Sequence, residues 1–509
     1  MSALRDGDQH RPGRDPHWVR RTGHALRPDP SRVLAMVFLP GQELLASGES
    51  RSTAVIGRVL ALPEPEVDAE LRRLSSAFAH RHRDVTSIWD AHFELVKHRL
   101  PGSPTLSPGR RRLVGACFTQ EFAIEGAALF NPSMVQHPDQ GGLPPGATRF
   151  VMTVRALGEG HVSSVELRTG VVDADGAIAL DAPPSVAVQA DPVPVTYSRS
   201  AFEHRLDDLG GDRTNSDFVL GELAPQFGRP ELDAALGALR DESLTRGLAV
   251  RTLDQIEQVA GCAYAVAFPA SSSIQERVLM PRGSAESHGV EDVRMVLFSY
   301  PDGSTEYLGT YCAFDGTSIA LQLLRTVDFV HFSMAPLSGP GAKDKGLALF
   351  PRQVGGRYLA LSRADRESNA IAASVDLEHW DEPVVIQRPE TAWELVQLGN
   401  CGPPIETEAG WLILTHGVGP MRTYGIGAML LDLADPTVVL GKLARPLLTA
   451  VGPERSGYVP NVVYSCGAML HDRTLVLPYG CSDSATRFAL VDLDALLAEL
   501  RPAPAETRV

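Results

Sequence analysis

The spacing of apolar residues divides the chain into helical and strand-like segments. From about Ser50 to Leu100 they recur at helical spacing, and Glu64 and Glu66 place acid in the first turn of one helix, where the helix dipole favours it. We therefore predict a mainly helical N-terminal segment over residues 31–112. A second stretch at helical spacing, about residues 201–258, is predicted to be a helical insertion between strands.

The rest of the ordered chain has the two-residue period of β-strands. From Val278 to Leu490 nearly every segment is a short strand-like run, with turn residues about every ten positions. Residues 1–30 are polar and rich in Arg and Pro, so we expect a disordered tail there. Residues 498–509 are expected to be a C-terminal tail.

A weak internal repeat sets the expected architecture. The segment LLRTVDFVHF (323–332) resembles IAASVDLEHW (371–380), and their aspartates, Asp328 and Asp376, are 48 residues apart. Asp432 and Asp492 continue the series at spacings of 56 and 60 residues. Spacings near 50, with about four strands each, are typical of propeller blades. We predict an all-β fold, a five-bladed β-propeller over residues 113–497, with the helical N-terminal segment and insertion packed outside it.

Composition limits which compartment and which partners we expect for this protein. The chain has 509 residues, 44% of them apolar, and a net charge of -15, which argues against nucleic acid and against an anionic membrane surface as partners. Neither a transmembrane run nor a signal peptide is apparent, so the expected compartment is the cytoplasm. Six cysteines without CxxC spacing are expected to be buried free thiols rather than a zinc site or a disulfide framework.

The clearest candidate for chemistry lies in GVEDVRMVLFSY, where Glu291-Asp292 precedes Val293-Arg294 at a strand-like run. A carboxyl held there can protonate a leaving sugar oxygen, and the arginine can fix its orientation and charge. The same residues would also serve as an ion pair that orders a loop, and nothing in this motif alone separates the two.

Eight segments in order carry a family resemblance. They are FNPSMV (130–135), GEGHVSSVELRTG (158–170), GVEDVR (289–294), GTYCAFDG (309–316), KDKGLALFPRQVGGRYLALSR (343–363), GNCGPPIETEAGWLILTHGVG (399–419), GYVPNVVYSCGA (457–468) and LVLPYGCSD (475–483). With them the chain resembles glycoside hydrolase family 130, the β-mannoside phosphorylases and β-mannosidases. The resemblance implies a five-bladed propeller with a central sugar pocket and inverting cleavage of β-mannosides, with β-1,2-linked manno-oligosaccharides as the leading substrate.

The resemblance also assigns site residues. Asp292 matches the general acid, which in the phosphorylases is thought to act through the 3-hydroxyl of the sugar. The expected substrate-binding residues are Asn131, Ser133, Arg294, Lys345, Arg363, His416, Tyr458 and Asp483. For several of them a structural role stays open: a turn at Asn131-Pro132 and a turn cap at His416 or Asp483. His161, in GEGHVSSVELRTG, could likewise face the ligand or be a purely structural histidine.

Hydrolysis and phosphorolysis need different groups beside the acid. Phosphate binding needs cations, and here Lys345 and Arg363 remain, whereas Ser362 stands where many family phosphorylases have His, and Thr317 and Ser318 where they commonly have Arg. A hydrolase needs a second carboxylate, for which Glu394 and Glu454 are the candidates.

We therefore expect a β-mannoside hydrolase, with a phosphorylase that releases mannose 1-phosphate as the alternative and a non-catalytic glycan-binding propeller as a further one. No metal and no cofactor are expected, apart from inorganic phosphate as co-substrate in a phosphorylase. The expected partner is a small oligosaccharide, and homo-oligomerisation is left open.

Overall fold

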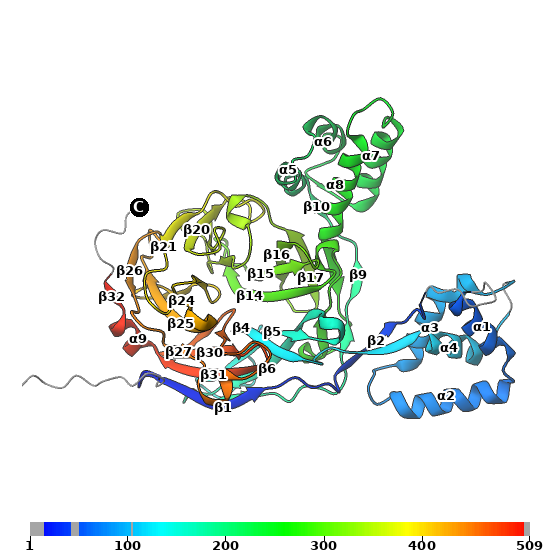
Figure 1. The fold of residues 1–509 in the computed structure, drawn as a ribbon, viewed down its shortest axis with the longest axis horizontal. Coiled ribbons are helices and arrows are strands. Elements are labelled where there is room, and N and C mark those ends of the chain that lie inside the picture. The colour runs from blue at the N-terminus through cyan, green and yellow to red at the C-terminus, as the bar shows by residue number, and fades with distance from the viewer. Residues whose placement is uncertain (1–14, 42–49, 103–104, 503–509) are drawn as a thin grey trace, which may run out of the picture.

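A computed structural model describes residues 15–41, 50–102 and 105–502, and over these residues the protein is mostly β-sheet with a few helices (Figure 1). Five sets of four strands form the body, and within each set neighbouring strands pair antiparallel. The sets, each given from first to fourth strand, are β4 (Ala128–Gln136), β5 (Thr148–Leu157), β6 (Ser163–Val172) and β7 (Ile178–Leu180); β14 (Gly289–Ser299), β15 (Thr305–Phe314), β16 (Ile319–Thr326) and β17 (His331–Pro336); β18 (Ala348–Leu349), β19 (Tyr358–Ser362), β20 (Asn369–Ser374) and β21 (Val384–Gln387); β22 (Gln397–Asn400), β24 (Gly410–Gly419), β25 (Thr423–Leu431) and β26 (Val439–Lys442); and β28 (Val463–Tyr464), β30 (Thr474–Cys481), β31 (Ala485–Asp492) and β1 (Val19–Leu26).

Shorter strands complete these sheets. They are β8 (Val188–Gln189), β9 (Asp191–Val193), β12 (Tyr264–Ala267), β13 (Arg277–Leu279), β23 (Ile405–Thr407), β27 (Leu448–Thr449), β29 (Met469–His471) and β32 (Arg501–Pro502). β12 extends the second set beyond β17, and β13 lies beside β6.

The four repeated aspartates of the sequence each come at the end of a third strand, and Asp173 takes this place in the first set; in the fifth set Asp492 caps the helix Leu493–Glu499. In all five, Asp173, Asp328, Asp376, Asp432 and Asp492, one carboxylate oxygen accepts amide hydrogens from residues two to four positions further on. Aspartate suits such turns because its short side chain bonds to the backbone just ahead of it. The repeat in the sequence is therefore a repeat of local structure.

Buried apolar side chains fill the space between neighbouring sets. One cluster joins sets one and two, one sets two and three, one sets three and four, one sets four and five, and one sets five and one. Each cluster has members from both sides of its boundary, for example Val151 and Met295, Phe298 and Trp380, Leu414 and Leu477, or Phe150 and Val476; Phe350 and Trp411 are in edge-to-face contact. Most of the core thus lies between neighbouring sets of strands.

The N-terminal helices form a small unit beside the body (Figure 1). They are α1 (Arg51–Ala61), α2 (Glu64–Phe78), α3 (Val85–Val96) and α4 (Pro108–Cys117). Side chains of Ser50, Asp84 and Ser107 cap α1, α3 and α4 by accepting backbone amide hydrogens. The two-stranded ribbon of β2 (Val33–Val37) and β3 (Thr119–Ala123) connects this unit to the body.

Three predicted boundaries were wrong. The helical segment does not end at residue 112, because α4 continues to Cys117 from its cap at Ser107, and residues 31–50 contribute the strand β2. The expected tail over 1–30 is ordered in its described part, since β1 pairs with β31; residues 1–14 lie outside the described residues. The C-terminal boundary at 497 falls inside α9 (Leu493–Glu499), and β32 pairs with β26; residues 503–509 are not described.

The helical insertion contains α5 (Arg199–Asp208), α6 (Arg213–Leu220), α7 (Arg229–Asp241) and α8 (Ala249–Cys262), together with the short strands β10 (Tyr197–Ser198) and β11 (Gln226–Phe227). It has its own buried core and projects from the body in Figure 1. The hydroxyls of Ser198 and Ser200 donate to Glu378 Oε2 at 2.9 and 2.8 Å, which ties its base to the third set.

The six cysteines are free thiols, and all but Cys117 are buried, as expected from the sequence. Across the described residues, none of the helices is long and apolar enough to cross a membrane.

Candidate active site

Each of the five sets has a loop of the same kind, the loop between its second and third strands. In an antiparallel set, the loop between the second and third strands lies beside the start of the first strand. These loops span 158–162, 315–318, 363–368, 420–422 and 482–484. They carry His161, Thr317 and Ser318, Arg363, Arg422 and Asp483, while Asn131 and Asp292 lie near the starts of the first strands β4 and β14.

Asp292 and Asn131 form the centre of the cluster. Asn131 Nδ2 donates to Asp292 Oδ1 at 2.8 Å, and both side chains are buried. Both residues have positive φ, 51° and 55°, and both lie where the strand pairing is interrupted. Asparagine and aspartate tolerate this conformation better than most residues, and such local strain is concentrated at functional sites.

Three cations surround the Asp292 carboxylate. Arg155 Nη1 lies 3.4 Å from Asp292 Oδ1, and its Nη2 donates to Glu291 Oε1 at 2.5 Å. Lys345 Nζ donates to Glu291 Oε2 at 2.8 Å. Arg294 Nη1 donates to the backbone carbonyl of Asp292 at 3.0 Å. The expected ion-pair partner of Asp292, the Arg294 guanidinium, thus holds the backbone rather than the carboxylate, and Arg155 takes the role of counter-ion.

This surrounding charge fixes the ionisation of Asp292. Burial opposes ionisation, but the three cations outweigh that cost, so the pKa of Asp292 lies below its ordinary value. A general acid often has a raised pKa, and Asp292 departs from that pattern because Arg155 stands beside it.

Asp483 is the carboxyl whose pKa is raised. Burial and then the charge of Asp292 raise the pKa of Asp483 to about 6. Arg155 and Arg422 pull in the opposite direction without cancelling this effect. The site therefore holds two interacting carboxyls whose environments separate their pKa values, an arrangement used for general acid–base chemistry.

His416 is a neutral, buried group beside Arg363. Its Nδ1 lies 3.0 Å from the Asn400 carbonyl, which makes Nδ1 the protonated nitrogen, and Arg363 Nη1 reaches Nε2 at 3.5 Å. Burial, and then the charge of Arg363, lower the pKa of His416 to about 3. The ring stacks on Tyr424 with centroids 6.0 Å apart.

Two further predicted residues, Ser133 and Tyr458, lie in different surroundings: Ser133 is buried and Tyr458 is exposed. The Ser133 hydroxyl accepts the Met295 amide at 3.0 Å, so it joins β4 to β14 and holds the two strands in register. Tyr458 is 60% exposed, and its ring lies 6.1 Å from the ring of His161. Tyr458 and His161 are thus exposed neighbours and not members of the buried Asn131–Asp292 cluster.

The two glutamates proposed to activate water lie in other surroundings. Glu394 Oε1 accepts the amides of Glu390 and Thr391, both at 3.1 Å, so it closes a turn. Glu454 accepts from Tyr479 at 2.8 Å and is paired with Arg21. Within the described residues, neither carboxylate hydrogen-bonds to a member of the Asp292 cluster. The prediction that one of them is the base has no support in these contacts.

Sequence reasoning missed Arg155 and Tyr464, and it gave no role to Glu291, although it named the pair Glu291-Asp292. The Tyr464 hydroxyl accepts a 2.6 Å hydrogen bond from Arg294 Nη2, and Arg155 reaches both carboxylates. A usable signal existed for Arg155, because a charged residue interrupts the apolar run FVMTVRAL just before a loop.

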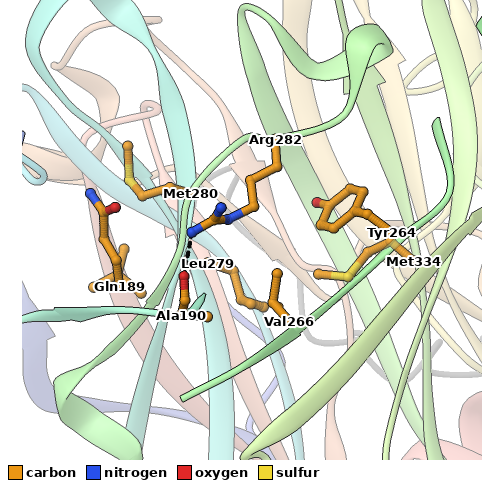
Figure 2. Close-up of a pocket in the computed structure, with 9 residues that line it drawn as sticks. Gln189, Ala190, Tyr264, Val266, Leu279, Met280, Arg282 and Met334 are labelled. Carbon is orange, nitrogen blue, oxygen red and sulfur yellow. Dashed lines mark hydrogen bonds between the residues drawn. The ribbon is translucent and has the colours of Figure 1, made fainter. Parts of the chain in front are cut away.

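Figure 2 shows an enclosed cavity that lies apart from this cluster, lined by residues of β8, β12 and β13 together with Arg282 and Met334. Its volume is about 10 Å³, room for no more than one water molecule. It cannot hold a sugar. In the described part of the chain, no group of three or more His, Cys, Asp or Glu side chains is arranged to hold a metal ion.

Comparisons with known proteins agree with the resemblance. Residues 269–501 match the family model of glycoside hydrolase family 130, described as beta-1,4-mannooligosaccharide phosphorylase. Over these residues, which are somewhat less than half of the chain, the sequence is similar to glycoside hydrolase family 130. The match includes Asp292, Lys345, Arg363, His416 and Asp483.

Two curated relatives are phosphorylases by name. The 1,2-beta-oligomannan phosphorylase of Thermoanaerobacter sp. is 37% identical over 153 residues, which cover 30% of this chain and 51% of that protein. The Beta-1,2-mannobiose phosphorylase of Listeria innocua is 31% identical over 230 residues, covering 44% of this chain and 63% of that protein. The chain thus spans between half and just under two thirds of these relatives. A solved structure of the Listeria innocua enzyme with beta-1,2-mannobiose is 22% identical, with a TM-score of 0.44, covering 74% of this chain and 93% of that chain.

Three positions depart from the phosphorylase pattern of family 130. The Ser362 hydroxyl donates to the Gly341 carbonyl at 2.8 Å and is buried, so it serves the fold. Thr317 and Ser318 form an exposed turn in which both amides donate to Asp315. Lys345, Arg363 and Arg422 remain as cations of the site, and Arg422 lies on the loop that follows β24.

Proposed function

We propose that this protein is an inverting β-mannoside phosphorylase. The observation that carries the proposal is Lys345, which pairs with Glu291 next to the buried Asn131–Asp292 pair, in a chain whose curated relatives are named phosphorylases; Arg363, beside His416, is the second cation. Phosphate is a dianion, and lysine and arginine are the side chains that hold it. The hydrolase that we first favoured gives way to the phosphorylase.

In the proposed reaction a phosphate oxygen attacks the anomeric carbon of the terminal mannosyl unit from the face opposite the glycosidic bond. The new bond is C1–O–phosphate, and the broken bond is C1 to the glycosidic oxygen. That oxygen leaves with a proton supplied from Asp292 by way of the sugar 3-hydroxyl, as the family resemblance implies. The products are mannose 1-phosphate with inverted configuration and a mannoside one unit shorter.

The lowered pKa of Asp292 has a consequence for this scheme. An ionised Asp292 must gain a proton before it can deliver one, and bound phosphate, whose charge offsets that of Arg155 and Lys345, favours protonation of the carboxyl. Lys345, which is proposed to bind phosphate, is therefore also one of the cations that keep Asp292 ionised before phosphate arrives.

A hydrolase would need a carboxylate that activates water. Glu394 and Glu454 are occupied by turn and inter-strand contacts, which removes the reason for preferring hydrolysis. A binding protein without turnover would not need two buried carboxyls with separated pKa values, so enzyme function is the better account.

We also propose that the five sets close into a five-bladed propeller around the site. Support comes from the consecutive strand order in each set, from the apolar cluster between sets five and one, and from the succession of the sets in Figure 1. In such an arrangement the five loops between second and third strands surround one mouth.

The proposed substrates are short β-1,2-linked mannosides, following the names of the two relatives, while the family model names a β-1,4-linked class. The deciding experiment offers β-1,2-mannobiose and β-1,4-mannobiose separately, each with and without inorganic phosphate, and identifies the products by chromatography. Phosphate-dependent formation of mannose 1-phosphate from the β-1,2 substrate is expected. Release of free mannose at the same rate without phosphate would overturn the proposal.

A further inference from the structure

The N-terminal strand is connected to the loop of Asp483 through one side chain, Arg21. β1 is the outer strand of the fifth set, where Arg21 pairs with Ala489 of β31. Although β1 lies four strands out in pairing order, the Arg21 guanidinium extends back across the sheet to residues that precede β28.

Arg21 is held by groups from three parts of the chain. Its Nε and Nη2 donate to the two carboxylate oxygens of Asp15 at 2.6 and 2.8 Å. Nη2 also donates to the Thr449 carbonyl at 2.7 Å, and Nη1 lies 3.1 Å from the Tyr479 hydroxyl and pairs with Glu454. The guanidinium plane is thus fixed on both edges, the arrangement in which arginine gives most specificity.

Glu454 connects Arg21 to the loop that contains Asp483. Its side chain binds Arg21 and accepts from Tyr479, and only 5% of it is exposed. Its backbone carbonyl accepts the hydroxyl of Ser482 at 2.5 Å. The residue that follows Ser482 is Asp483, whose pKa is influenced by the charges of Asp292, Arg155, Arg422 and Glu291.

The turn at Ser482-Asp483 needs such support. Both residues have positive φ, 48° and 47°, and neither is glycine. Such a conformation is strained for residues other than glycine and persists only where surrounding contacts enforce it. Besides the bond to Glu454, the Ser482 amide donates to the Val462 carbonyl at 2.8 Å, so the hydroxyl and the amide together anchor the turn.

We propose that Arg21 is a positioning residue for Asp483, acting through Glu454 and Ser482, so that the N-terminal strand is part of the working site and not only an edge of the fold. The inference rests on the proposed phosphorylase function. It assigns to Glu454 a task quite different from the general base first predicted for it.

Arg20 provides a matched control. It precedes Arg21 on the same strand, is exposed, and points to the opposite face. Arg21→Ala and Arg20→Ala remove the same kind of side chain from β1, so a difference between them reports the loss of the Arg21 contacts; Ser482→Ala then tests the path through Glu454 separately.

The test compares steady-state phosphorolysis of β-1,2-mannobiose by the full-length wild type, Arg20→Ala, Arg21→Ala and Ser482→Ala proteins. Arg21→Ala and Ser482→Ala should both lower kcat/KM for the mannoside about 10- to 100-fold and leave the KM for phosphate unchanged, because Lys345 and Arg363 are held by other sets. The acidic limb of the pH profile should move to lower pH in both, since an Asp483 released from Asp292 titrates closer to its ordinary pKa. Arg20→Ala should match the wild type.

The outcomes separate the two proposals. A wild type that forms no mannose 1-phosphate overturns the proposed function, and this inference with it. An active wild type with identical kinetics and pH profiles for Arg21→Ala and Arg20→Ala overturns the inference alone. A parallel loss of affinity for mannoside and phosphate would also overturn it, because that pattern indicates general unfolding. If Arg21→Ala does not fold, Arg21→Lys and Glu454→Gln must give the predicted split, or the inference fails.

Discussion

Asn131 and Asp292 meet through a 2.8 Å hydrogen bond, and each lies at an interruption of its own strand pairing with nearly the same positive φ. β4 and β14 are the first strands of neighbouring sets, so two equivalent irregularities bring an amide and a carboxylate together. The contact leaves Asn131 Oδ1 buried without a hydrogen-bond partner among the described residues. A buried acceptor of this kind suits a sugar hydroxyl, which can donate to it while accepting from another group.

Asp292→Asn should abolish most turnover without disturbing the fold. Asparagine tolerates the positive φ at this position and can still contact Asn131, but it has no proton to transfer. We expect phosphorolysis to fall about 10²–10⁴-fold, the usual contribution of general acid catalysis. The control is Asp302→Asn, in the exposed turn between β14 and β15. A folded Asp292→Asn protein with normal turnover would exclude the acid role.

Lys345→Ala should mainly weaken phosphate binding. Lys345 is partly exposed, with one ion pair to Glu291, so it is available to a dianion in the mouth of the site. We expect the KM for phosphate to rise at least about tenfold, equivalent to about 1.4 kcal/mol. Lys343→Ala, at an exposed position two residues earlier, is the matched control. Equal effects of the two substitutions would remove Lys345 from the phosphate site.

The repeat-based part of the fold was accessible from the sequence, because Asp328 and Asp376 each end a third strand and bond to the backbone just ahead. Such local chemistry leaves a local signal. The sequence contains no such signal for Arg21, because its partner Glu454 comes near it only when the two ends of the chain pair in one sheet. For the same reason β1 was mistaken for part of a disordered tail, and Glu454 for a base.

The candidate site was predicted in outline and not in its electrostatics. Asn131, Asp292, Lys345 and His416 were named from motif matches, and the structure brings Asn131 into contact with Asp292. The identity of the counter-ion could not be predicted, since Arg155 and Glu291 meet across two strands from different sets. The lowered pKa of Asp292 depends on the same Arg155 and was therefore not predictable either.

Asp483→Asn should stabilise the protein in a pH-dependent way. The pKa of Asp483 is about 6 in the folded protein against an ordinary 3.8, so the folded state binds the proton more tightly than the unfolded chain does. Stability from this group is present below about pH 4 and is lost as pH rises through 6, with a maximum effect of about 3 kcal/mol. The substitution should therefore raise the unfolding midpoint at pH 8 and change it little at pH 4.

Asp472→Asn is the control for this comparison. Asp472 also has positive φ, 54°, but it is exposed, so replacing it leaves the pH dependence unchanged. Chemical denaturation of both variants at the two pH values provides the measurement. An equal shift at pH 4 and pH 8 would show that the Asp483 carboxyl is not the group responsible.

Arg32→Met should strongly destabilise the junction between the N-terminal segment and the first set. Arg32 Nε lies 2.9 Å from Glu125 and its Nη2 lies 2.8 Å from Glu166, and all three side chains are almost completely buried. Removing one partner of a buried ion pair leaves an uncompensated charge and costs about 3–5 kcal/mol. Urea denaturation should show this loss, while Arg27→Met, at an exposed position, should show none. A loss below about 1 kcal/mol would mean that the remaining Arg168 satisfies both carboxylates.

Glu394→Gln should separate phosphorolysis from hydrolysis most cleanly. Glu394 Oε1 accepts two backbone amides, at positions 390 and 391, and a glutamine carbonyl oxygen can accept the same hydrogens. If Glu394 only closes this turn, turnover with phosphate should stay within about threefold of the wild type, which corresponds to less than about 0.7 kcal/mol in the barrier. If it activated water instead, the loss of its basic oxygen should remove about 10²–10⁴-fold of the rate. Product analysis completes the test, because a phosphorylase variant still releases mannose 1-phosphate. A folded Glu394→Gln protein that has lost more than a hundredfold in rate would restore the hydrolase and overturn the purely structural role of Glu394.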